Sequence, residues 1–469
     1  MSRGVPCPLR ATARTAPGSP AVVGEETVSY GELDRRVARL AGALRGACEP
    51  GSRVGLYLPQ DERYVTLLLA TLRAGLVAVP VSTRVPAAGV PPLLERAGCS
   101  ALVSTADLSP ELPPGVRVLE AEELAGGDAE IPGGKWRLDE PATVVFTSGS
   151  TGGPKAALHT LGNHYYSALG SNENIPIAPG DRWLAPLPLY HVGGLGALFR
   201  CLVSGAAMAL PRPGEPVGEA ATRLGSTHAS LVATQLRRLL DEGDVPETLR
   251  AVLLGGGAIP GTLLDAATEA GLPVHTSYGM TETASQVTTT PPGADRETLR
   301  TSGQVLAHRE LRISVEGEIL VRGRTLFLGY LDGEDLRDPA DEEGWFHTGD
   351  LGELDSAGYL TVRGRRDNRF VSGGENVQPE EIEAALKRLS GVEEAVVVPV
   401  PDAEFGERPA AFVRGETDAA ALSGELAETL PRFMVPVAFH PWPDSASSGM
   451  KPDRALLARL ARECRETAS

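Results

Sequence analysis

The residues FTSGSTGGPK, at positions 146–155, end an apolar run and form a loop rich in glycine and hydroxyl side chains. Glycine permits positive φ and close approach of the backbone, so successive N–H groups can converge on the oxygens of one phosphate. The hydroxyl groups and the lysine add further donors and a positive charge. This stretch predicts a phosphate-binding loop, with the candidate ligands Thr147, Ser148, Gly149, Ser150, Thr151, Gly152 and Lys155.

Two other interpretations of this loop are weaker. A Walker P-loop has a glycine and a magnesium-binding hydroxyl where this chain has Pro154 and Ala156. A flexible Gly/Ser linker does not need four hydroxyl residues interleaved with three glycines directly after a strand of buried type. The loop is therefore expected to bind phosphate outside the Walker class of kinases and ATPases.

The segments around the loop alternate between helix and strand patterns. Ser29 and Glu32 form a Ser-x-x-Glu capping box, and apolar residues then recur at helical spacing as far as Leu44. Short apolar runs closed by Gly or Pro alternate with such helices. These runs are Val54–Leu58, Leu76–Val81, Thr143–Thr147 and Ala251–Leu254. The alternation predicts an α/β fold of parallel or mixed sheets flanked by helices.

The pattern changes after about residue 310, where short strands lie between glycine-rich turns. The expected elements are strands at Glu318–Val321, Gly358–Val362 and Ala395–Val400, with one helix over Glu380–Leu389. A chain of 469 residues also exceeds what one hydrophobic core usually organises. We therefore expect a large N-terminal domain over residues 1–366 and a small α+β C-terminal domain over residues 367–469. The boundary lies near Asp367, in the charged stretch GRRDNR.

Composition limits the partners of the chain. It has 61 acidic and 44 basic side chains, a formal net charge of −17 and no basic cluster, which disfavours nucleic acid and anionic membranes. The N-terminal segment lacks the apolar core of a signal peptide, and no run approaches a membrane span. The five cysteines are scattered, without Cys-x-x-Cys spacing. A reduced, cytoplasmic protein is expected, while a homo-oligomer and a high-salt habitat stay open.

The phosphate loop resembles that of the adenylate-forming superfamily of acyl-CoA ligases, luciferases and peptide-synthetase adenylation domains. The resemblance implies that residues 1–366 are an AMP-binding domain and that residues 367–469 are a mobile lid. A second match is TSYGMTETAS, residues 276–285. The implied ligands are Ser277 and Tyr278 for adenine, Thr281 for the α-phosphate, and Glu282 with Thr151 for magnesium. A hard cation suits a carboxylate beside a pyrophosphate leaving group. Without the resemblance, Thr-Glu would be an ordinary helix cap.

Further matches follow in the same order as in the superfamily. LLGGGAIP, residues 253–260, resembles a strand and glycine turn that lie against adenine and the acyl group. The implied residues there are Gly255, Gly256 and Gly257. GWFHTGDLG supplies Asp350, which the resemblance places on both ribose hydroxyls, with Arg365 on the same sugar. A plain tight turn and a turn aspartate are the structural alternatives.

The C-terminal matches concern the hinge, the thiol and the catalytic cation. In the superfamily, the small domain swings about a hinge, which Asp367 matches, between an adenylating and a thioester-forming pose. The glycines Gly373 and Gly374, after Ser372, are expected to line the path of the pantetheine thiol. Lys451 matches the catalytic lysine, whose charge would stabilise attack of a carboxylate on the α-phosphate. It would otherwise be solvated surface.

Four stretches resemble the o-succinylbenzoate–CoA ligases of menaquinone biosynthesis within the superfamily. They are residues 187–200, 230–240, 364–383 and 398–412. The implied acyl-binding residues are His191, Gly193, Thr234, Gln235 and Gly256, with His191 also catalytic as the gate of the pocket. Gly193 departs from the serine often found there, which leaves the contact to a second carboxylate open. The other cations that could meet it are Arg432 and Lys451, and the alternative for His191 is a core histidine.

The sequence thus predicts a ligase that uses ATP and Mg²⁺ to activate a carboxylic acid as an acyl-adenylate. No carrier-attachment motif follows Lys451, so free coenzyme A is the expected acceptor. The alternatives are another aryl- or fatty acyl-CoA ligase, an enzyme that loads a separate carrier protein, and a non-catalytic nucleotide-binding regulator. The joint presence of Lys155, Glu282, Asp350 and Lys451 disfavours the regulator.

Overall fold

The chain forms two compact units in a computed structural model. The model describes residues 4–105, 112–124, 130–147, 154–243, 245–402, 405–443 and 453–467. The large unit comprises Met1–Ile259, Asp265–Leu311 and Val321–His347. The small unit comprises Pro260–Leu264, Arg312–Leu320 and Thr348–Ser469. The hinge expected at Asp367 stays a prediction.

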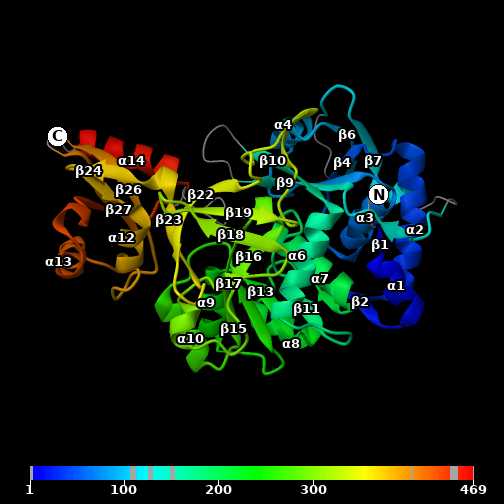
Figure 1. The fold of residues 1–469 in the computed structure, drawn as a ribbon, viewed down its shortest axis with the longest axis horizontal. Coiled ribbons are helices and arrows are strands. Elements are labelled where there is room, and N and C mark those ends of the chain that lie inside the picture. Colours follow the sequence, from blue (N-terminus) through cyan, green and yellow to red (C-terminus); the bar gives the residue numbers. More distant parts are fainter. Residues whose placement is uncertain are drawn as a thin grey trace. The chain divides into compact units, whose positions relative to one another are not determined.

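A nine-stranded sheet in the large unit has the order β17-β16-β15-β14-β13-β11-β12-β2-β3 (Figure 1). The bounds are β2 Pro20–Val23, β3 Thr27–Ser29, β11 Arg182–Leu184, β12 Ala207–Ala209, β13 His228–Leu231, β14 Ala251–Leu254, β15 Val274–Met280, β16 Ser285–Thr289 and β17 Gln304–Val305. The strands from β15 to β2 are parallel, and β3, β16 and β17 are antiparallel at the two edges. The carboxyl ends of the parallel strands therefore meet along one edge of the sheet.

A second sheet of the large unit has eight strands in the order β21-β20-β10-β9-β5-β4-β6-β7. The bounds are β4 Arg53–Tyr57, β5 Val77–Pro80, β6 Cys99–Ser104, β7 Arg117–Glu120, β9 Pro141–Thr147, β10 Lys155–Thr160, β20 Gly329–Asp332 and β21 Asp335–Arg337. The strands from β7 to β9 are parallel, whereas β10, β20 and β21 add antiparallel strands. A separate antiparallel pair joins β1 Val5–Pro6 to β8 Lys135–Trp136.

Helices of the large unit pack against these sheets through apolar faces. The helix α2, Tyr30–Ala47, begins where its sequence indicates, because Ser29 Oγ accepts a hydrogen bond from Glu32 N at 3.3 Å. Leu33 and Leu44 of this helix are fully buried, and each such side chain contributes about 1.5–3 kcal/mol. The other helices are α1 Pro8–Thr15, α3 Glu62–Arg73, α4 Val90–Arg96, α5 Ala121–Leu124, α6 Leu161–Asn174, α7 Val192–Ser204, α8 Val217–Leu224, α9 Ala233–Glu242 and α11 Arg296–Leu299, while α10 Gly261–Glu269 has residues in both units.

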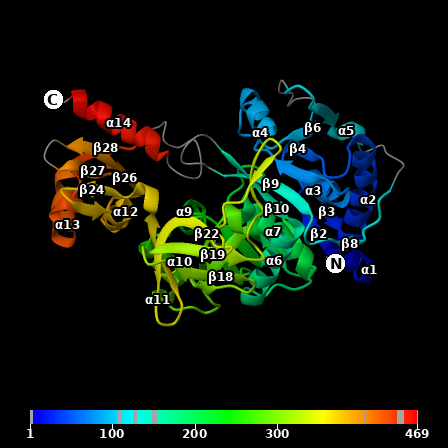
Figure 2. The same ribbon diagram turned by 45° about the horizontal axis from the view of Figure 1, so that its top comes forward.

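The small unit contains a five-stranded sheet with helices on both faces. The strands β25-β24-β27-β26 form a path, and β28 pairs with β27. Their bounds are β24 Phe370–Ser372, β25 Glu375–Val377, β26 Glu394–Asp402, β27 Gly406–Arg414 and β28 Ala438–Pro441, and the helices are α12 Pro379–Leu386, α13 Ala419–Thr429 and α14 Arg454–Thr467. Along β26, Val397 packs with α12 and α13, whereas Val396 and Val398 pack with α14. Figures 1 and 2 both show α14 on the face opposite to α12 and α13.

The α/β fold class is confirmed, and two details of the small unit are corrected. The predicted strand Ala251–Leu254 coincides with β14. The helix expected over Glu380–Leu389 is α12 and ends at Leu386, because Lys387 is its C-cap. The expectation of a single helix there was wrong, since α13 and α14 are also present. Helix α13 buries only a narrow stripe, Leu422 and Leu426, which gives a weak periodic signal.

The remaining strands are β18 Arg309–Ile313, β19 Glu318–Gly323, β22 Phe346–Leu354 and β23 Leu360–Arg365. Strands β22 and β23 pair antiparallel. Across the described ranges, no helix combines the length and the apolar character that a membrane crossing requires.

Candidate functional site

Four adjacent parallel strands of the large unit end in the segments that the sequence singled out. In sheet order these strands are β15, β14, β13 and β11. They lead, respectively, to Thr281, to Gly255, to the Thr234–Gln235 step and to His191. Ligands bind in α/β sheets at the carboxyl ends of the strands. The topology therefore brings nucleotide-side and acyl-side candidates to one edge of one sheet.

The strand register aligns the glycine turn with its neighbours. Leu254 of β14 pairs with Leu231 of β13 and with Thr276 of β15. Ser277 Oγ donates to the carbonyl of Leu254 at 2.7 Å, so this hydroxyl fixes the start of the turn. Gly256 has φ +85°, and an added Cβ would lie 3.2 Å from Val232. The turn requires glycine at this position, and the flanking Gly255 and Gly257 keep its surface open.

The predicted phosphate loop joins two antiparallel strands. Thr147 ends β9, Lys155 begins β10, and the two residues are cross-strand partners. A Walker loop leads from a strand into a helix, so this topology agrees with the exclusion of that class. The candidates Ser148, Gly149, Ser150, Thr151 and Gly152 lie outside the described residues.

Three residues from other segments form hydrogen bonds to the turn that carries Thr281 and Glu282. His159 Nε2 bonds to the carbonyl of Thr281 at 2.7 Å. The backbone N–H of Phe327 donates to the carbonyl of Glu282 at 2.8 Å. Tyr330 Oη donates to Glu282 Oε1 at 2.6 Å. None of these three supporting residues stood out in the sequence, because their proximity arises only from the packing of β10 and β20.

The backbone directly after this turn is strained. Ala284 has φ +52° and Ser285 has φ +117°, although neither residue is glycine. Such conformations cost roughly 1–3 kcal/mol each and persist only where the surroundings over-determine them. Strain of this kind gathers at binding sites, which agrees with the role expected for Thr281 and Glu282.

Two buried histidines stand behind the turn as neutral groups. Burial lowers the pKa of His159 to about 4 and also lowers the pKa of His164. Their rings lie 5.3 Å apart, and Thr143 Oγ1 bonds to His164 Nε2 at 2.7 Å. Since His159 Nε2 faces a carbonyl oxygen, this nitrogen carries the proton. His159 is thus a neutral donor that fixes the position of Thr281.

Glu282 is suited to a hard cation. Its carboxylate accepts from Tyr330 and forms no ion pair with any residue in the described part of the chain. The described residues also contain no group of three or more His, Cys, Asp or Glu side chains arranged for a metal. Magnesium usually keeps several waters and takes one or two carboxylates together with substrate phosphates. A single carboxylate such as that of Glu282 fits that pattern.

The acyl-side candidates have different roles in the structure. His191 is the N-cap residue of α7, and its ring lies 4.8 Å from that of Tyr190. At Gly193, an added Cβ would lie 2.9 Å from Leu187 Cδ1, so Leu187 occupies the space that a serine side chain would need. Thr234 is exposed. Gln235 Oε1 accepts from Val232 N at 3.1 Å and thereby caps α9, which leaves its amide nitrogen as the group for a substrate.

A buried arginine on α7 was missed by the sequence analysis. Arg200 is 1% exposed. Its guanidinium carbon lies 4.9 Å from the centre of the Trp183 ring, and its Nη2 donates a hydrogen bond to Gln286 Oε1 at 2.6 Å. Nη1 has no hydrogen-bond partner among the described residues, and no carboxylate there pairs with the guanidinium. Burial lowers the pKa of Arg200 to about 10, so it stays charged at neutral pH. A buried cation without an anion is unusual and points to a ligand.

The ribose candidates of the small unit lie side by side. Asp350 on β22 and Arg365 on β23 are cross-strand partners. Their side chains form an ion pair of 3.0 Å, and Arg365 Nη1 also donates to the carbonyl of Thr348 at 2.9 Å. The sequence placed each residue on the same sugar, and the structure brings them into direct contact.

The hinge candidate Asp367 lies in a short 3-10 turn, Arg366–Asn368. Arg366 pairs with the buried Glu318 at 2.8 Å, and Asn368 bonds to Glu380 at 2.5 Å. The residues on both sides of Asp367 are therefore anchored within the small unit, whereas its own carboxylate lies 3.8 Å from Arg365.

The thiol-path candidates form a tight hairpin. Gly373 and Gly374 have φ +61° and +89° and connect β24 to β25 by a two-residue turn. Positive φ at both central positions is the reason for two glycines. Ser372 is fully buried, and its Oγ has no partner within the described ranges.

Lys451 lies outside the described residues. Three positions later, Arg454 pairs with the buried Glu383 at 2.7 Å and donates to the carbonyl of Val397 at 2.8 Å. Burial raises the pKa of Glu383, and the adjacent guanidinium opposes that shift. The other candidate cation, Arg432, is exposed.

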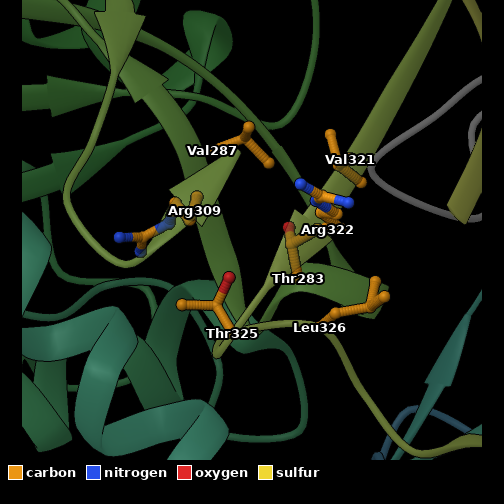
Figure 3. Close-up of a pocket in the computed structure, with 7 residues that line it drawn as sticks. All are labelled: Thr283, Val287, Arg309, Val321, Arg322, Thr325 and Leu326. Atoms are coloured by element: carbon orange, nitrogen blue, oxygen red, sulfur yellow. The ribbon is translucent and has the colours of Figure 1, made fainter. Parts of the chain in front are cut away.

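A small pocket of the large unit lies beside the site and does not contain it (Figure 3). Its lining residues are Thr283, Val287, Arg309, Val321, Arg322, Thr325 and Leu326, and they leave no room for even a water molecule. A nucleotide needs a cavity of roughly 300 Å³ or more, so this pocket is not its site. The pocket shares only the turn after Glu282 with the predicted site.

The chain belongs to the AMP-binding enzyme family. The family model matches residues 9–331, and the model of the AMP-binding enzyme C-terminal domain matches residues 381–447. A 2-succinylbenzoate–CoA ligase of Bacillus cereus is 35% identical over 431 residues, which cover 88% of this chain and 89% of that protein.

Solved structures agree with this assignment. One is o-succinylbenzoate CoA synthetase (MenE) from Bacillus subtilis in complex with the acyl-adenylate intermediate OSB-AMP, with a TM-score of 0.89, 32% identity and coverage of 97% of this chain and 98% of that chain. Another is the same synthetase in complex with ATP and a magnesium ion, with a TM-score of 0.89, 33% identity and coverage of 97% and 100%.

Proposed function

We propose that this chain is an ATP-dependent ligase that joins 2-succinylbenzoate to coenzyme A through an acyl-adenylate, in menaquinone biosynthesis. Proteins named 2-succinylbenzoate–CoA ligase or o-succinylbenzoate CoA synthetase share about a third of this chain's residues over most of its length. The observation that carries the proposal is the edge of the nine-stranded sheet, where four parallel strands present nucleotide-side and acyl-side residues together. The substrates are a small carboxylic acid, ATP and coenzyme A, and the protein acts in the cytoplasm.

The large unit would hold ATP and activate the acid. Thr281 would bind the α-phosphate, and Glu282 would hold Mg²⁺ with Thr151, which neutralises charge on the leaving pyrophosphate. The phosphate loop and Lys155 would take the outer phosphates, while Ser277, Tyr278 and the Gly255–Gly257 turn face adenine. His159 donates to the carbonyl of Thr281, so the residue that meets the α-phosphate is already in place before ATP binds.

The small unit would supply the remaining charges and the path of the thiol. Asp350 would accept the ribose hydroxyls, and Arg365 would hold that carboxylate in position. Lys451 would stabilise the charge that builds up when the carboxylate attacks the α-phosphate. A swing about Asp367 would then bring Gly373 and Gly374 to the acyl-adenylate, where the thiol of coenzyme A displaces AMP.

Arg200 gives this site a preference for an acid with two carboxylates. One carboxylate of 2-succinylbenzoate reacts, and the other needs a partner. Arg200 lies on α7, which His191 precedes as the N-cap residue, and its Nη2 is 3.4 Å from Ser285 Oγ, close to the Thr281–Glu282 turn. Its free Nη1 can bind that second carboxylate. This residue replaces Arg432 as our candidate, since Arg432 is exposed.

The test is acid-dependent AMP release with 2-succinylbenzoate, benzoate and a medium-chain fatty acid. We expect a strong preference for 2-succinylbenzoate. Arg200→Gln should raise its KM roughly 30-fold or more, because a buried charge loses its partner, and should change turnover of benzoate far less. Arg200→Lys keeps the charge and serves as the matched control. Preference for benzoate in the wild-type protein, or transfer to a carrier protein without coenzyme A activity, would contradict the proposal.

A further inference from the structure

Tyr330 touches two residues that the preceding proposal places on the triphosphate. It lies on β20, opposite Ala157 of β10. Its hydroxyl donates to Glu282 Oε1 at 2.6 Å, and Lys155 Nζ lies 5.1 Å from the centre of its ring. The Tyr330 side chain thus contacts both Lys155, at the end of the phosphate loop, and Glu282, the carboxylate expected to hold Mg²⁺.

The ring of Tyr330 is itself fixed by packing. Phe327 meets it edge-on, with the ring centres 4.8 Å apart and the planes at 70°. The backbone N–H of Phe327 also donates to the carbonyl of Glu282. Residues 327–330 therefore hold Glu282 at both its backbone and its side chain. Phe327 is 6% exposed, so this support is part of the core of the large unit.

The two contacts of Tyr330 have separable chemistry. A phenol that donates to a carboxylate forms a charge-assisted hydrogen bond, which fixes the side-chain rotamer and leaves the second oxygen for a cation. The π face attracts the lysine ammonium and limits where it can point. The first contact depends on the hydroxyl alone, whereas the second depends on the ring.

We propose that Tyr330 is a positioning residue for Mg-ATP: its hydroxyl orients the Glu282 carboxylate and its ring orients Lys155. The proposal rests on the adenylating function proposed above, though not on the identity of the acid. If the Tyr330 side chain only filled space, its hydroxyl would form no bond to Glu282. Its replacement would then change the affinity for ATP equally with and without Mg²⁺.

The test is the dissociation constant of ATP, measured by equilibrium binding with Mg²⁺ and with EDTA. Tyr330→Phe keeps the ring and should weaken binding about 10-fold with Mg²⁺, with no change in EDTA. Tyr330→Leu removes the ring as well and should weaken binding in both conditions. Tyr57→Phe is the matched control, since its hydroxyl bonds to the carbonyl of Val85 at 2.9 Å, and it should leave both constants unchanged.

A double-mutant cycle tests the specific pair. In Mg²⁺, Glu282→Gln with Tyr330→Phe should be much less than additive, because glutamine cannot hold the cation and its orientation by the Tyr330 hydroxyl then has little effect on binding. Additive effects, an unchanged Mg²⁺ dependence in Tyr330→Phe, or equal weakening with and without Mg²⁺ would overturn the role. Thermal unfolding of each variant identifies loss of fold.

Half-reactions separate this inference from the proposed function. Pyrophosphate exchange should fall in Tyr330→Phe, while thioester formation from synthetic acyl-adenylate should match the wild-type rate. If the wild-type protein binds Mg-ATP but does not activate 2-succinylbenzoate, the proposed substrate is wrong. The Tyr330 variants then still test the present inference. A wild-type protein that does not bind ATP would overturn both.

Discussion

The turn at Thr281–Glu282 and the turn at Gly373–Gly374 are held in different ways. The first is fixed by His159, Phe327 and Tyr330, which belong to other segments of the large unit. The second is fixed mainly by its own backbone, through two left-handed glycines between paired strands, and by one backbone hydrogen bond from Gly373 N to the carbonyl of Phe405 at 2.9 Å. A turn held by distant side chains depends on the identity of each of those side chains. A turn held by glycine and by backbone hydrogen bonds depends mainly on its two glycine positions.

The largest expected effect comes from the first turn. Glu282→Gln removes the charge that suits a cation and keeps the shape of the side chain. We expect the adenylation rate, measured by pyrophosphate exchange, to fall roughly 100 to 1000-fold, as for other groups that stabilise charge in the transition state. Thioester formation from acyl-adenylate should be unchanged. An equal loss of rate in both half-reactions would show that the two turns do not serve separate half-reactions.

Acid should weaken the support of the first turn. Above pH 6.5, His159 is neutral in the folded and the unfolded chain, so its contribution to stability is complete. Between pH 6.5 and about 4, the unfolded chain binds a proton that the folded chain does not, so the free energy of unfolding falls as pH falls. The loss is complete below about pH 4. At about 1.4 kcal/mol per pKa unit, His159 alone accounts for about 3 kcal/mol.

Denaturant unfolding across this pH range measures the effect. His159→Gln keeps a donor for Thr281 and cannot titrate, so its stability should fall less steeply with acid than that of the wild-type protein. His164, whose pKa is lowered in the same direction, keeps part of the slope in the variant. Parallel curves for the two proteins would contradict the assignment of His159 as a neutral donor.

The second turn should respond to a single methyl group. At Gly373, an added Cβ would lie 2.8 Å from Phe405 Cδ1 and would face a φ of +61°. Gly373→Ala should therefore cost about 1–2 kcal/mol of stability and slow the thioester step. Pyrophosphate exchange should stay at the wild-type rate. A loss of exchange instead would place this turn in the first half-reaction.

The candidate residues that the sequence located most easily lie in loops at the ends of strands. The phosphate loop, the Gly255–Gly257 turn and the Thr281–Glu282 turn all follow buried strands, and such strands are visible as apolar runs. The last two turns lie close together because β14 and β15 pair in parallel, which an α/β pattern implies. The mobile hinge at Asp367 and the role of Lys451 rest on resemblance and stay predictions.

What the sequence could not predict depends on contacts between distant segments. Arg200 and His159 lie inside a helix and a strand, where a single polar residue carries no pattern of its own. Tyr330 reaches Glu282 only because β20 pairs with β10 and places residues 48 positions apart in contact. Antiparallel pairing across such a separation depends on tertiary packing, which no local spacing encodes.

The smallest expected effect distinguishes the two glycines of the second turn. Gly374 has φ +89°, and an added Cβ there meets nothing within 4 Å, so only the backbone conformation restricts it. Asparagine tolerates left-handed φ, and Gly374→Asn should change the free energy of unfolding by about 0.5 kcal/mol or less. Thermal unfolding and the rate of thioester formation measure this directly. If Gly374→Asn slows the thioester step as much as Gly373→Ala without loss of stability, open space at Gly374 is needed for the thiol rather than for the turn, and the second turn then depends on its substrate as much as on its backbone.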